Sequence, residues 1–284
     1  MSRRRTRPSP DAVETPADDP HGIRVEWDDT RPRAATVMRD GHPQSYVDLD
    51  SPENLAFEYV QHFACVLDTL PGGPLAVTHV GGAGLSLARY VEATRPGSPQ
   101  IVLEPDATLT DVVRRELPLP TRHRIRVRPT DGATGVAALA DASADAVVVD
   151  AYTDGRVPAE LGAVPFLTDC ARVLRPGGVL LLNLADEPGL AYAARVAAGI
   201  PLTHRALVAT HDILKGRRFG NTVLVASAAP LDVDALRRRL ARSPFPTGLL
   251  ADRELDRRFA GARPFTDDSQ PSPEPPALRG WRVR

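Results

Sequence analysis

The sequence is poor in lysine and cysteine, and both shortages exclude classes of protein. Lys215 is the only lysine among 284 residues, and because 35 basic residues face 36 acidic ones the formal net charge is −1. Such a chain lacks the basic excess typical of nucleic-acid or anionic-membrane binding. Its two cysteines, Cys65 and Cys170, have no Cys or His neighbours at metal-ligand spacing. We therefore expect buried thiols in a reducing compartment and no metal site.

Long apolar runs are lacking as well. No stretch approaches the ~20 residues that span a bilayer. The basic start "MSRRRTRPSPD" runs into Pro and Asp instead of an apolar segment, which argues against a secretory signal. We expect a cytoplasmic protein without membrane contacts. A hydrophobic content of 42% is sufficient for a sizeable core.

Composition and patterning divide the chain into four parts. Residues 1–20 are rich in Pro, Arg and Asp without periodicity, which predicts a disordered leader, and residues 263–284 form a similar Pro-rich tail. Residues 21–70 hold three short β-branched runs and then "SPENLAFEYVQHFACVLDTL", whose Ser-Pro-Glu start and apolar spacing predict a helix. This part is expected to be a small β meander with a linking helix. Residues 71–262 form the main domain.

The main domain alternates apolar strands with helices. The expected strands are "LAVTHV", "QIVLE", "RIRVR", "AVVVD", "GVLLLNL", "HRALVAT" and "GNTVLVAS". Apolar runs without polar alternation are typical of strands buried on both faces, and alternation with helices indicates a parallel sheet. We predict an α/β fold, a doubly wound, mostly parallel seven-stranded sheet of the Rossmann type, preceded by the β meander.

Glycines and acids follow successive strands, at the carboxyl ends where such sheets bind ligands. The turn "VGGAGLSL" places Gly81, Gly82 and Gly84 where backbone approaches a ligand closely and helix N–H groups are free. Taken alone, a tight corner explains this turn equally well. Glu104 ends the second strand and suits the two hydroxyls of a ribose. A helix-capping acid is the structural alternative, and it suits Asp106 better.

Two more strand ends carry acids. Asp131 and Gly132 follow the third strand, where an Asp can accept a hydrogen bond from an exocyclic amine such as that of adenine, although an ordinary Asp-Gly turn explains the pair as well. Asp150 ends the fourth strand and Asp154 lies four residues further on, where packing gives no reason for acids. Together these positions predict an adenosyl pocket flanked by carboxylates. The clustered acids and the lack of a "GKS" or "GKT" disfavour a phosphate there.

In this order and spacing, the motifs between Met38 and Ser227 resemble those of the spermidine synthases, the polyamine aminopropyltransferases, including their shorter bacterial relatives. "RDGHPQSYVDLD" is similar to the N-terminal hairpin of that family and places Gln44 at the family glutamine, and Tyr59 falls where the family has a tyrosine. "VLEPD", "TDG", "VVVDAYTDGRVPAEL" and "RVLRPGGVLLLN" are similar to the motifs that follow. The resemblance implies a methyltransferase-like Rossmann fold and, by analogy, a homodimer.

The resemblance also implies a reaction. An aminopropyl group would pass from decarboxylated S-adenosylmethionine to a di- or polyamine such as putrescine, releasing methylthioadenosine, with no permanently bound cofactor and no nucleic acid involved. Asp150 would accept the proton of the attacking amine, while Asp154 and Tyr59 would orient that amine. The co-substrate would be held by Gln44, Gly81, Gly82, Gly84, Glu104, Asp131 and Gly132.

Two departures from the family pattern leave alternatives open. The family glycine motif commonly carries an Asp that meets the donor's aminopropyl amine, and this position is Gly84 here. The family "DSSD" is altered to "DAYTD", which moves or removes the second acid. An S-adenosylmethionine-dependent methyltransferase, or a catalytically impaired relative that binds a nucleoside or polyamine, therefore remains an alternative.

Overall fold

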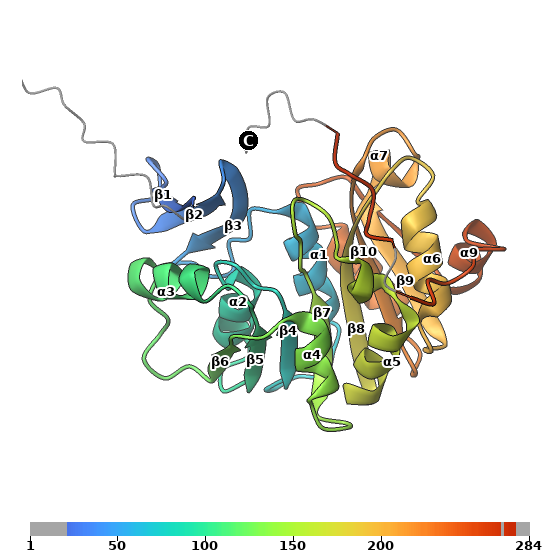
Figure 1. Cartoon of the computed structure of the whole chain (residues 1–284), viewed down its shortest axis with the longest axis horizontal. Coiled ribbons are helices and arrows are strands. Elements are labelled where there is room, and N and C mark those ends of the chain that lie inside the picture. Colours follow the sequence, from blue (N-terminus) through green and yellow to red (C-terminus); the bar gives the residue numbers. More distant parts are fainter. Residues whose placement is uncertain (1–21, 268–269, 277–284) are drawn as a thin grey trace, which may run out of the picture.

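The computed structural model describes residues 22–267 and 270–276, so the predicted leader and parts of the predicted tail lie outside the described residues. Within them the chain forms two sheets (Figure 1). The smaller has the order β1-β2-β3, with β1 at Ile23–Trp27, β2 at Ala34–Arg39 and β3 at His42–Asp48. The larger has eight strands in the order β11-β9-β10-β8-β7-β4-β5-β6.

The small sheet is the predicted antiparallel meander. Asp40 and Gly41, both with positive φ (48° and 77°), form the two-residue turn between β2 and β3, as Asp-Gly favours. Its inner residues Ile23, Val37 and Val47 share one buried cluster with side chains of the main domain. The meander therefore stands on the main domain and has no core separate from it.

The large sheet confirms the predicted fold class. Its strands are β4 (Val77–Val80), β5 (Gln100–Leu103), β6 (Ile125–Arg128), β7 (Ala144–Val149), β8 (Leu174–Asp186), β9 (His204–Thr210), β10 (Gly220–Ser227) and β11 (Thr247–Ala251). The five strands from β6 to β8 are parallel, and β10, β9 and β11 follow in antiparallel pairs. The edge strand β11 is an addition to the seven predicted strands. Its five residues are all half-buried, so the segment "TGLLA" lacks the alternation of buried and exposed positions that would predict a strand.

Helices cover both faces of the large sheet (Figure 1). Helices α4 (Gly132–Ala137), α5 (Val164–Val173) and α6 (Ala191–Gly199) share one buried cluster with it. Helices α1 (Glu58–Leu67), α2 (Ser86–Thr94) and α8 (Val233–Leu240) pack on the other face, and α3 (Ala107–Glu116) joins the cluster beneath the meander. The short helices α7 (His211–Leu214) and α9 (Asp252–Arg258) complete the domain, and no described helix has both the length and the apolarity to cross a membrane.

The linking helix starts later than the sequence predicts. The prediction starts the helix at the Ser-Pro-Glu signature of residues 51–53, whereas α1 begins at Glu58. The Asp48 carboxylate explains this difference, because it accepts hydrogen bonds from the backbone N–H of Ser51 and from the Asn54 side chain at 3.0 and 3.1 Å. The signature residues therefore close a turn after β3.

Strand order defines the place where a ligand is expected. From β4 the chain moves outward to β5 and β6 and then returns to β7, on the other side of β4. In doubly wound sheets the crevice at such a reversal is the usual binding position. It lies here between the carboxyl ends of β4 and β7, which lead directly into Gly81 and Asp150.

The described part of the tail packs onto the main domain. Phe265 is buried and pairs with Ala163 in an isolated parallel bridge. Ser272 is fully buried; its hydroxyl accepts a hydrogen bond from the Val157 N–H at 2.8 Å, and its own N–H donates to the Val157 carbonyl. These contacts hold the tail beside the loop that follows β7.

Candidate functional site

The glycine turn after β4 is bent sharply against the end of β7. Gly81 has φ of +78°, and a Cβ there would collide with the Asp150 carbonyl oxygen, so only glycine fits. Two non-glycine residues of the same turn, Ala83 (φ 37°) and Leu85 (φ 62°), also adopt left-handed backbone. Such conformations are costly and cluster at ligand-binding turns. The turn therefore combines a position that only glycine fits with two left-handed non-glycine residues.

Five of the predicted site residues meet in one small pocket at this point. Its lining includes Gln44, Tyr59, Gly81, Gly82 and Asp150. The cavity has a volume of about 40 Å³. The meander, α1, the glycine turn and the end of β7, which are far apart in sequence, each supply a side of it.

Asp150 is the carboxylate residue that lines this pocket. Burial raises the pKa of its carboxyl group to about 6, and hydrogen bonding from Asn183 and Tyr59 opposes this shift by stabilising the carboxylate. The Asn183 side chain donates to Asp150 Oδ1 at 2.9 Å. A carboxylate with a pKa this close to neutrality is suited to exchange a proton with a bound base.

Asn183 is the functional candidate that sequence reasoning missed. It lies in the buried middle of β8, and its carbonyl oxygen accepts a hydrogen bond from the Tyr152 hydroxyl at 3.1 Å. Its side-chain oxygen is buried and has no hydrogen-bond partner among the described residues. The available signal was a lone polar residue inside "GVLLLNL", where only apolar residues are expected.

Tyr59 reaches the pocket from the first turn of α1. Its ring stacks on Phe57, with centroids 6.0 Å apart, and meets Phe63 edge-on at 6.1 Å. Burial raises the pKa of its hydroxyl well above the ordinary value, and the nearby Asp150 charge adds to the effect. Tyr59 therefore stays protonated and acts as a hydrogen-bond donor.

Of the two acids after β5, Asp106 is the helix cap that the sequence suggests, and the contact of Glu104 with a ribose stays a prediction. Asp106 caps α3, because its side chain accepts a hydrogen bond from the Leu109 N–H at 2.9 Å, and it forms an ion pair with Arg39 at 2.8 Å. Glu104 is only 9% exposed, and its carboxylate accepts a hydrogen bond from the Asp106 N–H at 3.1 Å. Burial raises the pKa of Glu104, while the N–H groups of Asp106 and Ala83 oppose the rise. The contact with Ala83 sets Glu104 against the glycine turn.

Asp131 and Gly132 lie outside the pocket lining. The Asp131 side chain accepts a hydrogen bond from the Thr134 N–H at 2.8 Å and so caps α4. A Cβ at Gly132 would collide with Val80 of β4, so this glycine allows α4 to pack closely on the sheet. Both residues thus have a structural role, and contact with adenine stays a prediction.

Strand β3 closes over Gly84. A Cβ at Gly84 would lie 2.9 Å from both Ser45 Cβ and Val47 Cγ2. The Ser45 and Ser86 hydroxyls are 2.8 Å apart, and Ser86 donates to the Tyr46 carbonyl at 2.6 Å. These hydrogen bonds join β3 to the start of α2. The space in which an Asp side chain would stand at position 84 is therefore occupied by the meander.

Asp154 does not join the pocket. It has φ of 52° and lies in an exposed turn closed by a bridge between Thr153 and Arg156. Its role as an orienting acid stays a prediction. Cys65 and Cys170 are free, and within the described ranges no group of three His, Cys, Asp or Glu side chains is placed to hold a metal ion.

Comparison with known proteins gives no matching family model, but it does give relatives. The polyamine aminopropyltransferase of Chromobacterium violaceum is 28% identical over 141 residues, covering 49% of this chain and 53% of the relative. The protein of the same name from Neisseria meningitidis is 24% identical over the same length. The alignment thus spans about half the length of these curated relatives.

One solved structure matches nearly the whole chain. A probable spermidine synthase from Corynebacterium glutamicum superposes with a TM-score of 0.82 at 26% identity, covering 91% of this chain and 95% of the other. This chain resembles the spermidine synthases in sequence and in fold. The predicted resemblance is therefore confirmed. Human methyltransferase-like protein 13, solved with SAH, shares the fold at a TM-score of 0.52 and 23% identity, covering 75% of this chain and 96% of the other.

Proposed function

We propose that this spermidine synthase-like protein is an aminopropyltransferase, which moves an aminopropyl group from decarboxylated S-adenosylmethionine to a di- or polyamine. The observation that carries the proposal is the half-buried Asp150 carboxyl, with a pKa raised to about 6, beside Tyr59 and a strained glycine turn at the strand reversal. The names of the relatives support the same reaction class.

Asp150 would act as the proton acceptor. A diamine at neutral pH carries two charges, since alkyl amines have pKa values near ~10, and the attacking nitrogen must lose a proton to expose its lone pair. That nitrogen attacks the donor methylene next to the sulfonium sulfur; the carbon–sulfur bond breaks, its electron pair stays on sulfur, and methylthioadenosine leaves. The nitrogen's proton passes to Asp150, which Asn183 holds in place.

The nucleoside would lie along the glycine turn. A cavity of about 40 Å³ would take only the reacting groups, so ribose and adenine would extend toward Glu104 and Asp131. Helix α2 starts at this turn without a side-chain cap, which leaves its N–H groups available. Gln44 closes the pocket from the side of the meander.

The far amine of a dication needs a second acid. The Asp154 side chain forms no ion pair or hydrogen bond with a described residue, and Asp154 lies on the exposed turn four positions after Asp150. We propose that Asp154 binds the far amine of the substrate. Assembly as a homodimer stays a prediction.

The first test is product release. Incubated with decarboxylated S-adenosylmethionine and putrescine, the purified protein is expected to release methylthioadenosine, measured by chromatography with mass detection. If neither this donor nor S-adenosylmethionine is consumed with any of a panel of di- and polyamines, both enzyme assignments fail. Tight binding of a nucleoside or polyamine without turnover would instead identify an impaired relative.

A methyltransferase is the second candidate, and Gly84 is the observation that favours it. The resemblance implies that an Asp at this position meets the amine of the decarboxylated donor, whereas here β3 occupies the space. Calorimetric titration with both donors separates the two functions. Aminopropyl transfer requires tighter binding of the decarboxylated donor, and methyl transfer requires tighter binding of S-adenosylmethionine.

The pH profile tests the role assigned to Asp150. Because the charged form is the proton acceptor and its pKa is about 6, kcat is expected to fall as pH drops through 6. Asn183→Leu removes a hydrogen bond that stabilises the carboxylate, so the acid limb should move to higher pH. If Asn183→Leu lowers kcat at every pH but leaves the acid limb at the same pH, Asn183 does not stabilise the charged form of Asp150.

A further inference from the structure

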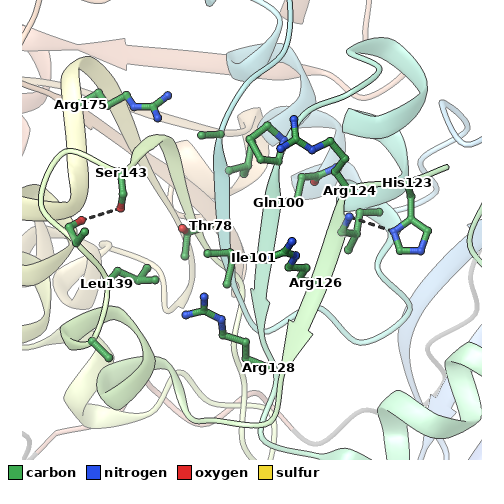
Figure 2. A pocket seen from close by; sticks show the side chains of 16 residues that line it. Thr78, Gln100, Ile101, His123, Arg124, Arg126, Arg128, Leu139, Ser143 and Arg175 are labelled. Atoms are coloured by element: carbon green, nitrogen blue, oxygen red, sulfur yellow. Dashed lines mark hydrogen bonds between the residues drawn. The ribbon is translucent and has the colours of Figure 1, made fainter.

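A second and much larger cavity lies away from the proposed active site. It is a groove of about 770 Å³ at the amino ends of the parallel strands (Figure 2). Its floor is one row of sheet residues, since Thr78, Ile101 and Arg126 are register neighbours on β4, β5 and β6. Helix α4 ends at Ala137, and the three residues that follow it, Ala138, Leu139 and Ala140, also line the groove.

Arginine side chains dominate the groove. Arg124, Arg126, Arg128 and Arg175 all line it, from β6 and its approach on one side and from β8 on the other (Figure 2). Two of them are already engaged: Arg124 donates to the Gly97 carbonyl, and Arg175 forms an ion pair with Asp145 at 3.0 Å.

Arg126 and Arg128 are different. Both are exposed, and neither side chain forms a hydrogen bond or ion pair with a described residue. Standing two residues apart on one strand, they project from the same face, with Cα atoms about 6.6 Å apart. Two like charges on one face repel each other, and an anion bound by both would offset the repulsion. No carboxylate side chain lines the groove.

We propose that this groove binds a ligand with a polyphosphate chain, with Arg126 and Arg128 as its anchors. The planar guanidinium group offers paired donors that match phosphate oxygens better than a lysine does. Ile101 and Leu139 add an apolar surface beside the arginines, and the volume lies within the range of small-molecule sites. The ligand is either a nucleoside polyphosphate or a free polyphosphate, which share this chemistry.

The experiment is a calorimetric titration of the full chain with ATP, tripolyphosphate and inorganic phosphate. We expect ATP and tripolyphosphate to bind more tightly than phosphate, and Arg126→Gln/Arg128→Gln to weaken them by about 10- to 100-fold. Arg126→Lys/Arg128→Lys should retain part of the affinity. Tighter binding of ATP identifies a nucleotide site, and equal binding identifies the polyphosphate chain as the whole determinant.

Arg114→Gln/Arg238→Gln is the matched control, because it removes two exposed arginine charges outside the groove. Asp150→Asn should bind these ligands as the unaltered protein does, which separates this site from the proposed reaction. The proposal is overturned if no polyphosphate binds at millimolar concentration, or if the control weakens binding as much as the groove variant. It is also overturned if only a single-stranded oligonucleotide binds.

Discussion

Asp150→Asn is expected to reduce kcat of the proposed aminopropyl transfer by about 10²- to 10⁴-fold, the usual contribution of a general base. The amide has the shape of the carboxyl group and can still accept the hydrogen bond from Asn183, but it cannot take a proton. Donor binding should change little, because the glycine turn contacts position 150 through the backbone. Steady-state kinetics with calorimetric donor titration measures both quantities.

The same variant should be more stable than the unaltered protein. Burial raises the pKa of Asp150 from 3.8 to about 6, so above pH 6 the folded protein bears the cost of a buried charge. Asn removes that cost, and the free energy of unfolding at pH 8 should rise by about 1–3 kcal/mol. The gain should shrink as pH falls from 6 toward 4. Thermal melts at both pH values, with the exposed Asp111→Asn as control, measure it.

A loss of activity together with a gain in stability would identify Asp150 as a functional acid held at a cost to the fold. An Asp150→Asn variant that keeps full turnover would end its assignment as base. One that loses turnover and also melts at lower temperature would mean that the carboxylate supports the structure.

The fold was predictable because its strands carry strong local signals. Runs such as "VVVD" and "VLLLN" are buried on both faces in β7 and β8, and their apolar composition predicts this burial. The edge strand β11 gave no such signal. The sequence places the start of α1 too early, because Asp48, which lies outside the helical pattern, accepts a hydrogen bond from the Ser51 N–H. Side-chain hydrogen bonds of this kind decide where a helix begins, and hydrophobic periodicity does not reveal them.

Strand ends predict part of the pocket, since Gly81 and Asp150 line it, whereas Asp131 also follows a strand and lies outside the lining. Asp150 and the glycine turn follow from strand order alone, because parallel strands bring their carboxyl ends together. Asn183 was not predictable in this way, because it lies inside β8 and its importance comes from its distance to Asp150. The closure of β3 over Gly84 likewise depends on packing between the meander and the main domain.

Gly84→Asp, which introduces the acid that the resemblance to the spermidine synthases implies, is expected to destabilise the protein by at least about 3 kcal/mol and to leave turnover without improvement. The new Cβ would lie 2.9 Å from Ser45 Cβ and Val47 Cγ2, so β3 would have to move. Overpacking of this kind typically costs 1–3 kcal/mol, and a carboxylate buried at this position adds to it. Chemical denaturation gives the stability, and kinetics with both donors gives the turnover.

Two companion variants divide the cost into its parts. Gly84→Ala adds only the Cβ, so its loss measures the steric contribution. Combining Gly84→Asp with Ser45→Gly and Val47→Ala clears the atoms nearest the new side chain, and it should recover stability relative to Gly84→Asp alone. If the cleared variant also gains affinity for the decarboxylated donor, the meander and Gly84 together set donor choice. If Gly84→Asp is as stable as the unaltered protein, β3 can move at little cost. The packing of the meander would then not explain why position 84 is a glycine.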